Sequence, residues 1–287
     1  MTDTNNQDPI VIVGGGQAAV QLCLAIRKEK VSAPAVMLSE EANYPYHRPP
    51  LSKSFLSGET DEEKLNMRPP SFYQSKAVEV RLETPVLAID PQARTVSTSD
   101  GVQNYQSLVI ATGARPRPLP ISGADLGGVH LLRDLDQSKH IARELQNADS
   151  VAVIGAGFIG LEFASVAAKM GKQVTVFDTV DRVMAQAVSP TMSAWFEKQH
   201  RSNGIDLQLN NSVANIVGKD KVEQLETTSG DRLDCDLLVI GIGVIPNDEI
   251  ASTAGLACDD GIIIDEYCQT SVEGIYAAGD CARHPYP

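Results

Sequence analysis

The sequence predicts an α/β protein made of two doubly wound domains with parallel sheets, one of them inserted in the other. Two observations predict this fold class. An apolar strand, a glycine-rich turn and a helix follow one another at residues 9–28 and again at residues 151–170, with the helices expected over Val20–Lys28 and Leu161–Met170. Each helix leads into a second apolar strand, at residues 35–38 and 174–177. Both segments therefore have the strand–helix–strand order of a Rossmann-like unit, and two such units indicate two domains.

The glycine turns point to the ligand class. Glycines at these positions allow a tight turn and let the backbone approach a pyrophosphate, whose charge then lies at the helix N-terminus. The alternative is that each turn only packs its helix against the sheet. The pattern is formed by Gly14, Gly16 and Ala19 in the first copy and by Gly155, Gly157 and Gly160 in the second.

Each unit also carries an acidic residue where its second strand ends. Glu40, followed by Glu41, comes after the first strand, and Asp178 comes after the second. Both lie roughly two dozen residues beyond the first glycine, where a carboxylate can accept hydrogen bonds from ribose hydroxyls. Two glycine turns with matching acids predict two dinucleotide sites.

The rest of the pattern sets the domain boundaries. Residues 78–99 alternate apolar and polar residues in short runs, as in a β-rich insert, and the proline-rich residues 115–120 indicate a linker. Further short strands are predicted at residues 108–110, 237–240 and 274–280. We therefore expect one domain made of residues 1–117 and 247–287, with residues 118–246 inserted as the second.

Composition excludes several classes. The formal net charge of −13 disfavours sequence-independent nucleic-acid binding. No apolar run approaches the roughly 18 residues of a membrane helix, so no membrane partner is expected. The polar N-terminus lacks the basic region of a secretory signal, which favours a cytoplasmic protein.

The five cysteines are irregularly spaced. None forms a CxxC or CxxxxC pair, and residues 40–60 contain no cysteine. This spacing favours reduced thiols with structural roles and gives no metal site.

A proline-rich string, "YPYHRPPLSK", occupies residues 44–53. It carries two cations shortly after the first ribose acid. Arg48 could neutralise a pyrophosphate and Lys53 could lie against a flavin ring. From the residues alone, a basic surface loop is an equal alternative.

The string resembles the FAD-dependent NAD(P)H ferredoxin and rubredoxin reductases of the pyridine nucleotide-disulfide oxidoreductase superfamily. Four further segments are similar to motifs of that family: "VIATGARPRPLP", "VIGAGFIGLE", "LLVIGIGVIPN" and "TSVEGIYAAGDCAR". Family members continue beyond the last motif into a C-terminal interface domain, which we expect this chain to lack.

The resemblance implies two cofactors. The first domain would bind FAD and the inserted one NADH. Implied FAD contacts are Gly14, Gly16, Ala18, Glu40, Arg48, Lys53, Thr112, Gly113, Arg115 and Asp280. Implied NADH contacts are Gly155, Gly157, Ile159, Gly160, Glu162, Asp178 and Gly243.

The implied activity is electron transfer from NADH through FAD to a small iron–sulfur ferredoxin or a rubredoxin. An NADH oxidase or other NADH:acceptor reductase is the alternative within enzymes, and a truncated, non-catalytic nucleotide-binding module is the alternative outside them. Lys53 and Glu162 are the implied catalytic residues, one from each domain. A carboxylate within about 4 Å would keep the lysine charged in a low-dielectric cleft. Asp178 would repel a 2′-phosphate and so favour NADH, although Arg182 offers a nearby cation.

Overall fold

The computed structural model describes residues 8–73 and 78–285 and divides them into two compact units. Residues 1–7, on which the argument against a secretory signal rests, lie outside the described residues. The first unit consists of Met1–His47, Asn66–Arg115 and Ile245–Pro287, and the second of Arg48–Leu65 and Pro116–Val244. The predicted fold class, α/β with two doubly wound parallel-sheet domains, is confirmed.

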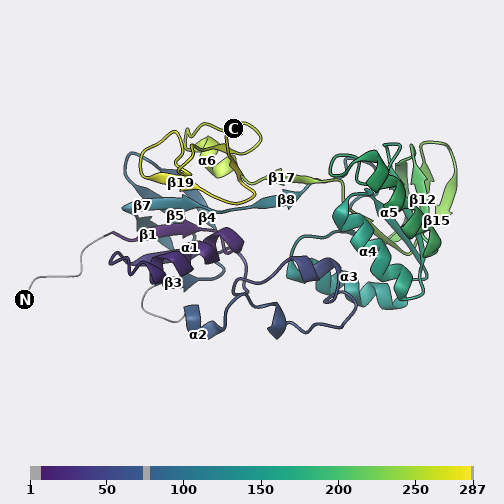
Figure 1. The fold of residues 1–287 in the computed structure, drawn as a ribbon, viewed down its shortest axis with the longest axis horizontal. Helices are drawn as coiled ribbons and strands as arrows, with labels where there is room; N and C mark the ends of the chain where they lie inside the picture. The colour runs from purple at the N-terminus through teal and green to yellow at the C-terminus, as the bar shows by residue number, and fades with distance from the viewer. Residues whose placement is uncertain (1–7, 74–77, 286–287) are drawn as a thin grey trace, which may run out of the picture. The chain divides into compact units, whose positions relative to one another are not determined.

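The first unit is built on a five-stranded parallel sheet of order β19-β7-β1-β2-β3 (Figure 1). Helix α1 (Gln17–Lys28) covers one face, where Ala19, Cys23 and Ile26 pack against strand residues. The strands are β1 (Ile10–Val13), β2 (Ala35–Leu38), β3 (Val78–Arg81), β7 (Ser107–Ile110) and β19 (Ile275–Ala277).

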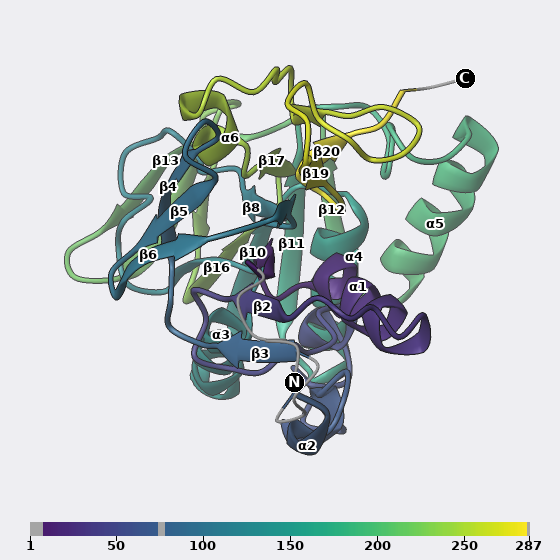
Figure 2. The ribbon, with the colours of Figure 1, turned by 90° about the vertical axis from the view of Figure 1, so that its left-hand side faces the viewer.

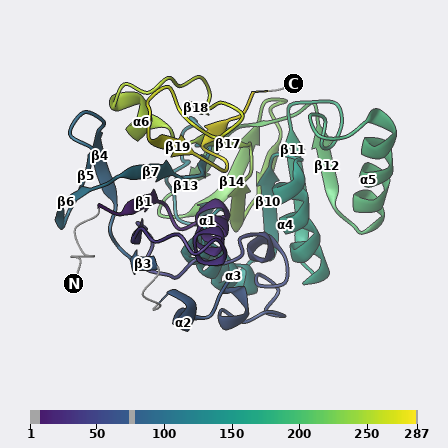
Figure 3. The same ribbon diagram turned by 60° about the vertical axis from the view of Figure 1, so that its left-hand side comes forward.

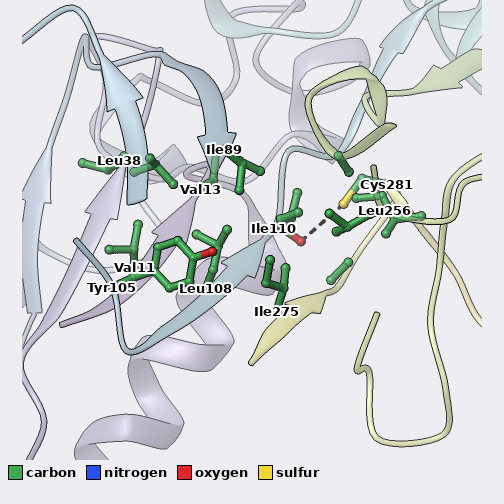
Figure 4. Close-up of a cluster of buried hydrophobic side chains, with 14 of the residues drawn as sticks. Val11, Val13, Leu38, Ile89, Tyr105, Leu108, Ile110, Leu256, Ile275 and Cys281 are labelled. Atoms are coloured by element: carbon green, nitrogen blue, oxygen red, sulfur yellow. Dashed lines mark hydrogen bonds between the residues drawn. The ribbon is translucent and has the colours of Figure 1, made fainter. Parts of the chain in front are cut away.

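An antiparallel three-stranded sheet covers the other face of this sheet. It has the order β4-β5-β6 (Val86–Asp90, Thr95–Thr98, Gly101–Asn104), and α6 (Glu249–Thr253) packs beside β4 (Figure 2). Figure 4 shows the core between these elements, including Val11, Ile89 and Ile110. The β-rich insert expected at residues 78–99 is therefore one edge strand of the main sheet followed by two strands of a covering sheet.

The second unit repeats this plan. Its parallel sheet has the order β12-β11-β10-β16-β9, and α4 (Phe158–Lys169) packs against β10 and β11 (Figure 3). Helix α5 (Pro190–Ser202) lies against β12, and α3 (Leu135–Asn147) against β9. The strands are β9 (Val129–Leu131), β10 (Ser150–Ile154), β11 (Gln173–Asp178), β12 (Asp206–Leu209) and β16 (Leu237–Ile240). The covering antiparallel sheet is formed by β13 (Val213–Gly218), β14 (Val222–Thr227) and β15 (Arg232–Asp234).

The same backbone hydrogen bonds recur in both units. Gly14 N donates to Leu38 O at 2.8 Å, and Gly155 N donates to Phe177 O at 2.8 Å. The strand that follows is also placed alike, since Ala111 N bonds to Val13 O and Gly241 N to Ile154 O, each at 2.8 Å. Residues of the two units can therefore be matched pair by pair.

Residues 48–65 pack with the second unit, whereas the expected boundaries placed them in the first domain. This segment contains two 3₁₀ helices, η1 (Pro49–Ser52) and η2 (Glu63–Leu65). The fully buried Ser138 of α3 donates through Oγ to Leu51 O at 2.8 Å, and Lys139 forms an ion pair with Glu62. The remaining short elements are α2 (Pro70–Tyr73), β8 (Ala114–Pro116), β17 (Val244–Pro246), β18 (Ile262–Ile263) and β20 (Ala282–Arg283).

The predicted strands lie where expected, but both glycine-turn helices begin early. They start at Gln17 and Phe158, and the expected starts at Val20 and Leu161 were wrong. The second glycine of each motif, Gly16 or Gly157, is itself the N-cap residue, so the chain enters the helix immediately after the turn.

Two neighbouring glycines should respond differently to alanine. Gly155 has φ +110°, and a Cβ there would lie 2.3 Å from Gly241 O, whereas Gly157 has φ −81° and an open surrounding. We expect Gly155→Ala to lower the free energy of unfolding by about 2 kcal/mol or more. Gly157→Ala is the matched control and should change it by less than about 0.5 kcal/mol. Urea unfolding measures both, and equal losses would contradict the close-contact argument.

Candidate functional site

In each unit, one helix begins at a glycine turn without a side-chain cap. The first glycine of each turn packs tightly, since a Cβ on Gly14 would lie 2.3 Å from Ala111 O, as at Gly155. The second glycine does not. Among the described residues, no atom beyond the chain neighbours lies within 4 Å of a Cβ built on Gly16 or Gly157. Because glycine has no side chain to cap a helix, the first-turn N–H groups are left for another partner, and an anion is the favoured one.

The third motif position differs between the units. Ala19 is fully buried against the sheet, whereas a Cβ on Gly160 would lie 2.0 Å from Gly155 O, so only glycine fits there. At the preceding position, Ala18 approaches the chain after β19, since a Cβ on Gly279 would lie 3.2 Å from its Cβ. This contact brings the predicted site residue Asp280 next to the start of α1. The residue of the second unit that corresponds to Ala18 is Ile159, which is 38% exposed.

Asp178 is the last residue of β11, and its carboxylate is tied to the glycine turn. Oδ2 accepts from Ala156 N at 2.6 Å, and Oδ1 accepts from Val180 N at 3.2 Å. In the pairwise match, the first-unit counterpart of Asp178 is the buried Ser39. Glu40 lies one residue farther along and is exposed. The two predicted ribose acids are therefore not at equivalent positions.

Arg182, which the sequence offered as a cation near Asp178, is engaged in its own loop. Its guanidinium donates to Val188 O at 2.9 Å, Ser193 Oγ at 2.8 Å and Ala185 O at 2.5 Å. These bonds hold the loop between β11 and α5 in place.

Lys53 and Glu162 form the expected ion pair. Nζ lies 2.7 Å from Oε2, with side chains 46% and 30% exposed. Both residues belong to the second unit, so the expectation of one residue from each domain was wrong, because residues 48–65 pack with the second unit. Lys53 Nζ also donates to Pro49 O at 3.2 Å. The same Oε2 accepts from Ser52 Oγ at 2.7 Å. Glu162 is the fifth residue of α4 and follows the glycine turn by one turn of helix.

The predicted residues after β7 are held together by Asn247. Thr112 Oγ1 donates to Asn247 O at 2.6 Å, and Asn247 N donates to Gly113 O at 2.9 Å. Arg115 donates to Asn247 Oδ1 at 2.9 Å and forms an ion pair with Glu249. The hydrogen bond from Arg115 lowers the pKa of the Glu249 carboxyl.

Two further predicted residues belong to the second unit. Arg48 Nη1 donates to Arg133 O at 3.1 Å, next to the start of α3. Gly243 follows β16, has φ +100° and is exposed, with its carbonyl accepting from Arg117 N at 2.9 Å. It stands where the chain leaves the sheet, as Gly113 does in the first unit.

Known proteins share this fold. The pyridine nucleotide-disulphide oxidoreductase family matches residues 8–287. The chain belongs to this family. Rhodocoxin reductase of Rhodococcus erythropolis is 41% identical over 97% of this chain and 66% of its own length. Rubredoxin-NAD(+) reductase of Pseudomonas putida is 38% identical over 95% of this chain and 71% of its own. The solved complex of putidaredoxin reductase with putidaredoxin superposes with a TM-score of 0.93 at 39% identity. The match covers 98% of this chain and 69% of that chain.

The chain thus spans about two thirds of the length of the curated relatives. The family comprises FAD-dependent NAD(P)H oxidoreductases. The residues present fit such cofactors, because the open positions at Gly16 and Gly157 leave room for a pyrophosphate at each helix N-terminus. In the part of the chain that the structure describes, no helix is long and apolar enough to span a bilayer.

The family name refers to a disulphide, yet all five cysteines are free. Burial raises the pKa of the Cys23 and Cys235 thiols to about 12, so both are protonated and unreactive at neutral pH. The buried Cys281 donates to Ile110 O at 3.5 Å and packs in the first core. These contacts are those of structural thiols.

Three residues of the site were missed from the sequence. Ser52 adjoins Lys53 in the "PPLSK" string, and its position beside a cation was the available signal. Asn247 ends the quoted "VIPN" segment, but its contacts with Thr112 and Arg115 join residues far apart in the chain. No local pattern indicated a role for Ser138, because a serine inside a helix is common and does not reveal its hydrogen-bond partner.

Proposed function

We propose that the chain is the core of an NADH-dependent flavoprotein reductase that passes electrons through FAD to a small iron–sulfur ferredoxin or a rubredoxin. The observation that carries the proposal is the repeated open glycine turn, one in each unit. Two such turns provide for two dinucleotides in one chain. The relatives named as reductases of rhodocoxin and rubredoxin support this acceptor class.

The first unit would hold FAD and the second NADH. When bound, FAD supplies an acceptor for hydride and a donor of single electrons. The protein binds and orients both cofactors. The proposed FAD contacts within the first unit are Gly14, Gly16, Ala18, Glu40, Thr112, Gly113, Arg115 and Asp280. The NADH set is Gly155, Gly157, Ile159, Gly160, Glu162, Asp178 and Gly243.

Lys53 and Glu162 would act as a unit. The Glu162 carboxylate holds the Lys53 ammonium in position through their 2.7 Å ion pair. The ammonium would stabilise negative charge on a cofactor bound beside it. Neither side chain acts as a nucleophile, in keeping with a chain that has no cysteine in residues 40–60.

Rapid kinetics test the proposal. The FAD-loaded protein is mixed with NADH without oxygen, flavin bleaching is followed, and ferredoxin or rubredoxin is then added as acceptor. Rapid bleaching with turnover of the added carrier supports the proposal. Bleaching with oxygen as the sole acceptor indicates an NADH oxidase, and a flavin that NADH never reduces indicates a nucleotide-binding module. Either of these results overturns it.

The coenzyme preference follows from Asp178. We expect at least a tenfold preference for NADH over NADPH in kcat/KM, equivalent to about 1.4 kcal/mol, because the carboxylate repels a 2′-phosphate and Arg182 is engaged elsewhere. Asp178→Asn should reduce the preference. Asp181→Asn removes an exposed charge nearby and serves as the control. Equal efficiency of the wild type with both coenzymes would remove Asp178 from the ribose site.

The ion pair gives a second prediction. Lys53→Ala and Glu162→Ala should each slow flavin reduction by about ten- to a thousandfold while FAD stays bound. The double variant should lose less than the product of the single effects, because contacting partners are coupled. Lys139 and Glu62 form an ion pair of the same length, 2.7 Å, in the same unit and provide control variants. Independent, multiplicative losses at Lys53 and Glu162 would contradict a joint role.

A further inference from the structure

Glu162 accepts two hydrogen bonds on one oxygen. Lys53 Nζ and Ser52 Oγ both lie 2.7 Å from Oε2. The donors are adjacent in sequence, since η1 ends at Ser52 and Lys53 is its C-cap residue. Two convergent donors restrict the rotamers of the glutamate more than one flexible lysine does.

The two donors differ in how firmly they are held. Ser52 is 5% exposed, whereas the Lys53 side chain is 46% exposed. An ion pair between partly exposed side chains is screened by solvent and costs both partners rotamer freedom. The short, buried serine has a single side-chain dihedral to order and is the better-defined donor.

The backbone beneath Ser52 is fixed as well. Ser138, fully buried on α3, donates through Oγ to Leu51 O at 2.8 Å, and Leu51 is itself 2% exposed. A continuous set of contacts therefore runs from α3 through Leu51 and Ser52 to Glu162 on α4, all within the second unit.

We propose that Ser52 is a positioning residue that acts through Glu162, and that Ser138 holds the backbone that carries it. Without the hydroxyl, Glu162 keeps its lysine partner but loses its fixed rotamer, and the Lys53 ammonium moves with it. This inference rests on the proposed function, because it assigns Ser52 to the same ion pair.

The test uses the FAD-loaded protein and stopped-flow reduction by NADH. Ser52→Ala should lower the limiting rate of flavin reduction by about tenfold, with the apparent Kd for NADH and the FAD content changed less than about twofold. Ser165→Ala is the matched control, since Ser165 lies on α4, as Glu162 does, and its hydroxyl donates to Leu161 O instead. It should reduce flavin at the wild-type rate.

Two further measurements separate positioning from general support. Ser52→Ala in a Glu162→Ala background should cause no further loss, because the oxygen that accepts from Ser52 is already removed. Hydrogen–deuterium exchange of the amides in residues 48–58, which needs no turnover, should stay within about twofold in Ser52→Ala. It should rise at least tenfold in Ser138→Ala, because that change frees a buried carbonyl.

A wild-type rate in Ser52→Ala, a further loss in the Glu162→Ala background, or raised exchange in Ser52→Ala would each overturn the inference. Failure of the proposed function looks different, because the wild-type flavin would then not be reduced by NADH at all.

Discussion

The close packing of each glycine turn against the neighbouring strand end is the constraint on which both units depend. At Gly14 and Gly155 the backbone comes so near the carbonyls of Ala111 and Gly241 that no side chain fits. This approach closes the strand–turn–helix connection tightly enough for the helix to begin immediately after its N-cap residue, Gly16 or Gly157. An uncapped helix N-terminus at the edge of a parallel sheet is the direct result, and its free N–H groups favour an anion such as a phosphate.

The two units use this frame with different polar chemistry. In the second unit, Asp178 accepts from the amide of the turn itself, so the acid that would meet a ribose also stiffens the glycine loop. In the first unit the equivalent place is taken by the buried Ser39, and the acid moves to Glu40. The helices also differ, since Ala19 can approach its sheet where Gly160 must be glycine. Similar backbones thus carry different polar side chains beside their glycine turns.

Local patterns in the sequence were sufficient for the fold class. Continuous apolar runs located strands such as Ala35–Leu38 and Leu237–Ile240, and the glycine spacing located both turns. Contacts between residues distant in sequence were beyond such patterns. Nothing local indicates that Asn247 bonds to Thr112, or that residues 48–65 pack against α3 through Ser138. The Lys53–Glu162 pair was reached only through family resemblance, since charge spacing does not record a contact across more than a hundred residues.

The order of segments along the chain has a consequence for synthesis. Strand β19 pairs in parallel with β7, but the whole of residues 116–244 lies between them in the chain. The first unit therefore cannot complete its sheet on the ribosome until the inserted unit has emerged, whereas the second unit has all its sheet strands in one continuous stretch. Such a non-local closure is slow, and until β19 arrives the edge of β7 stays open to pairing with other chains. Early folding of the inserted unit shortens the effective distance that the chain must close.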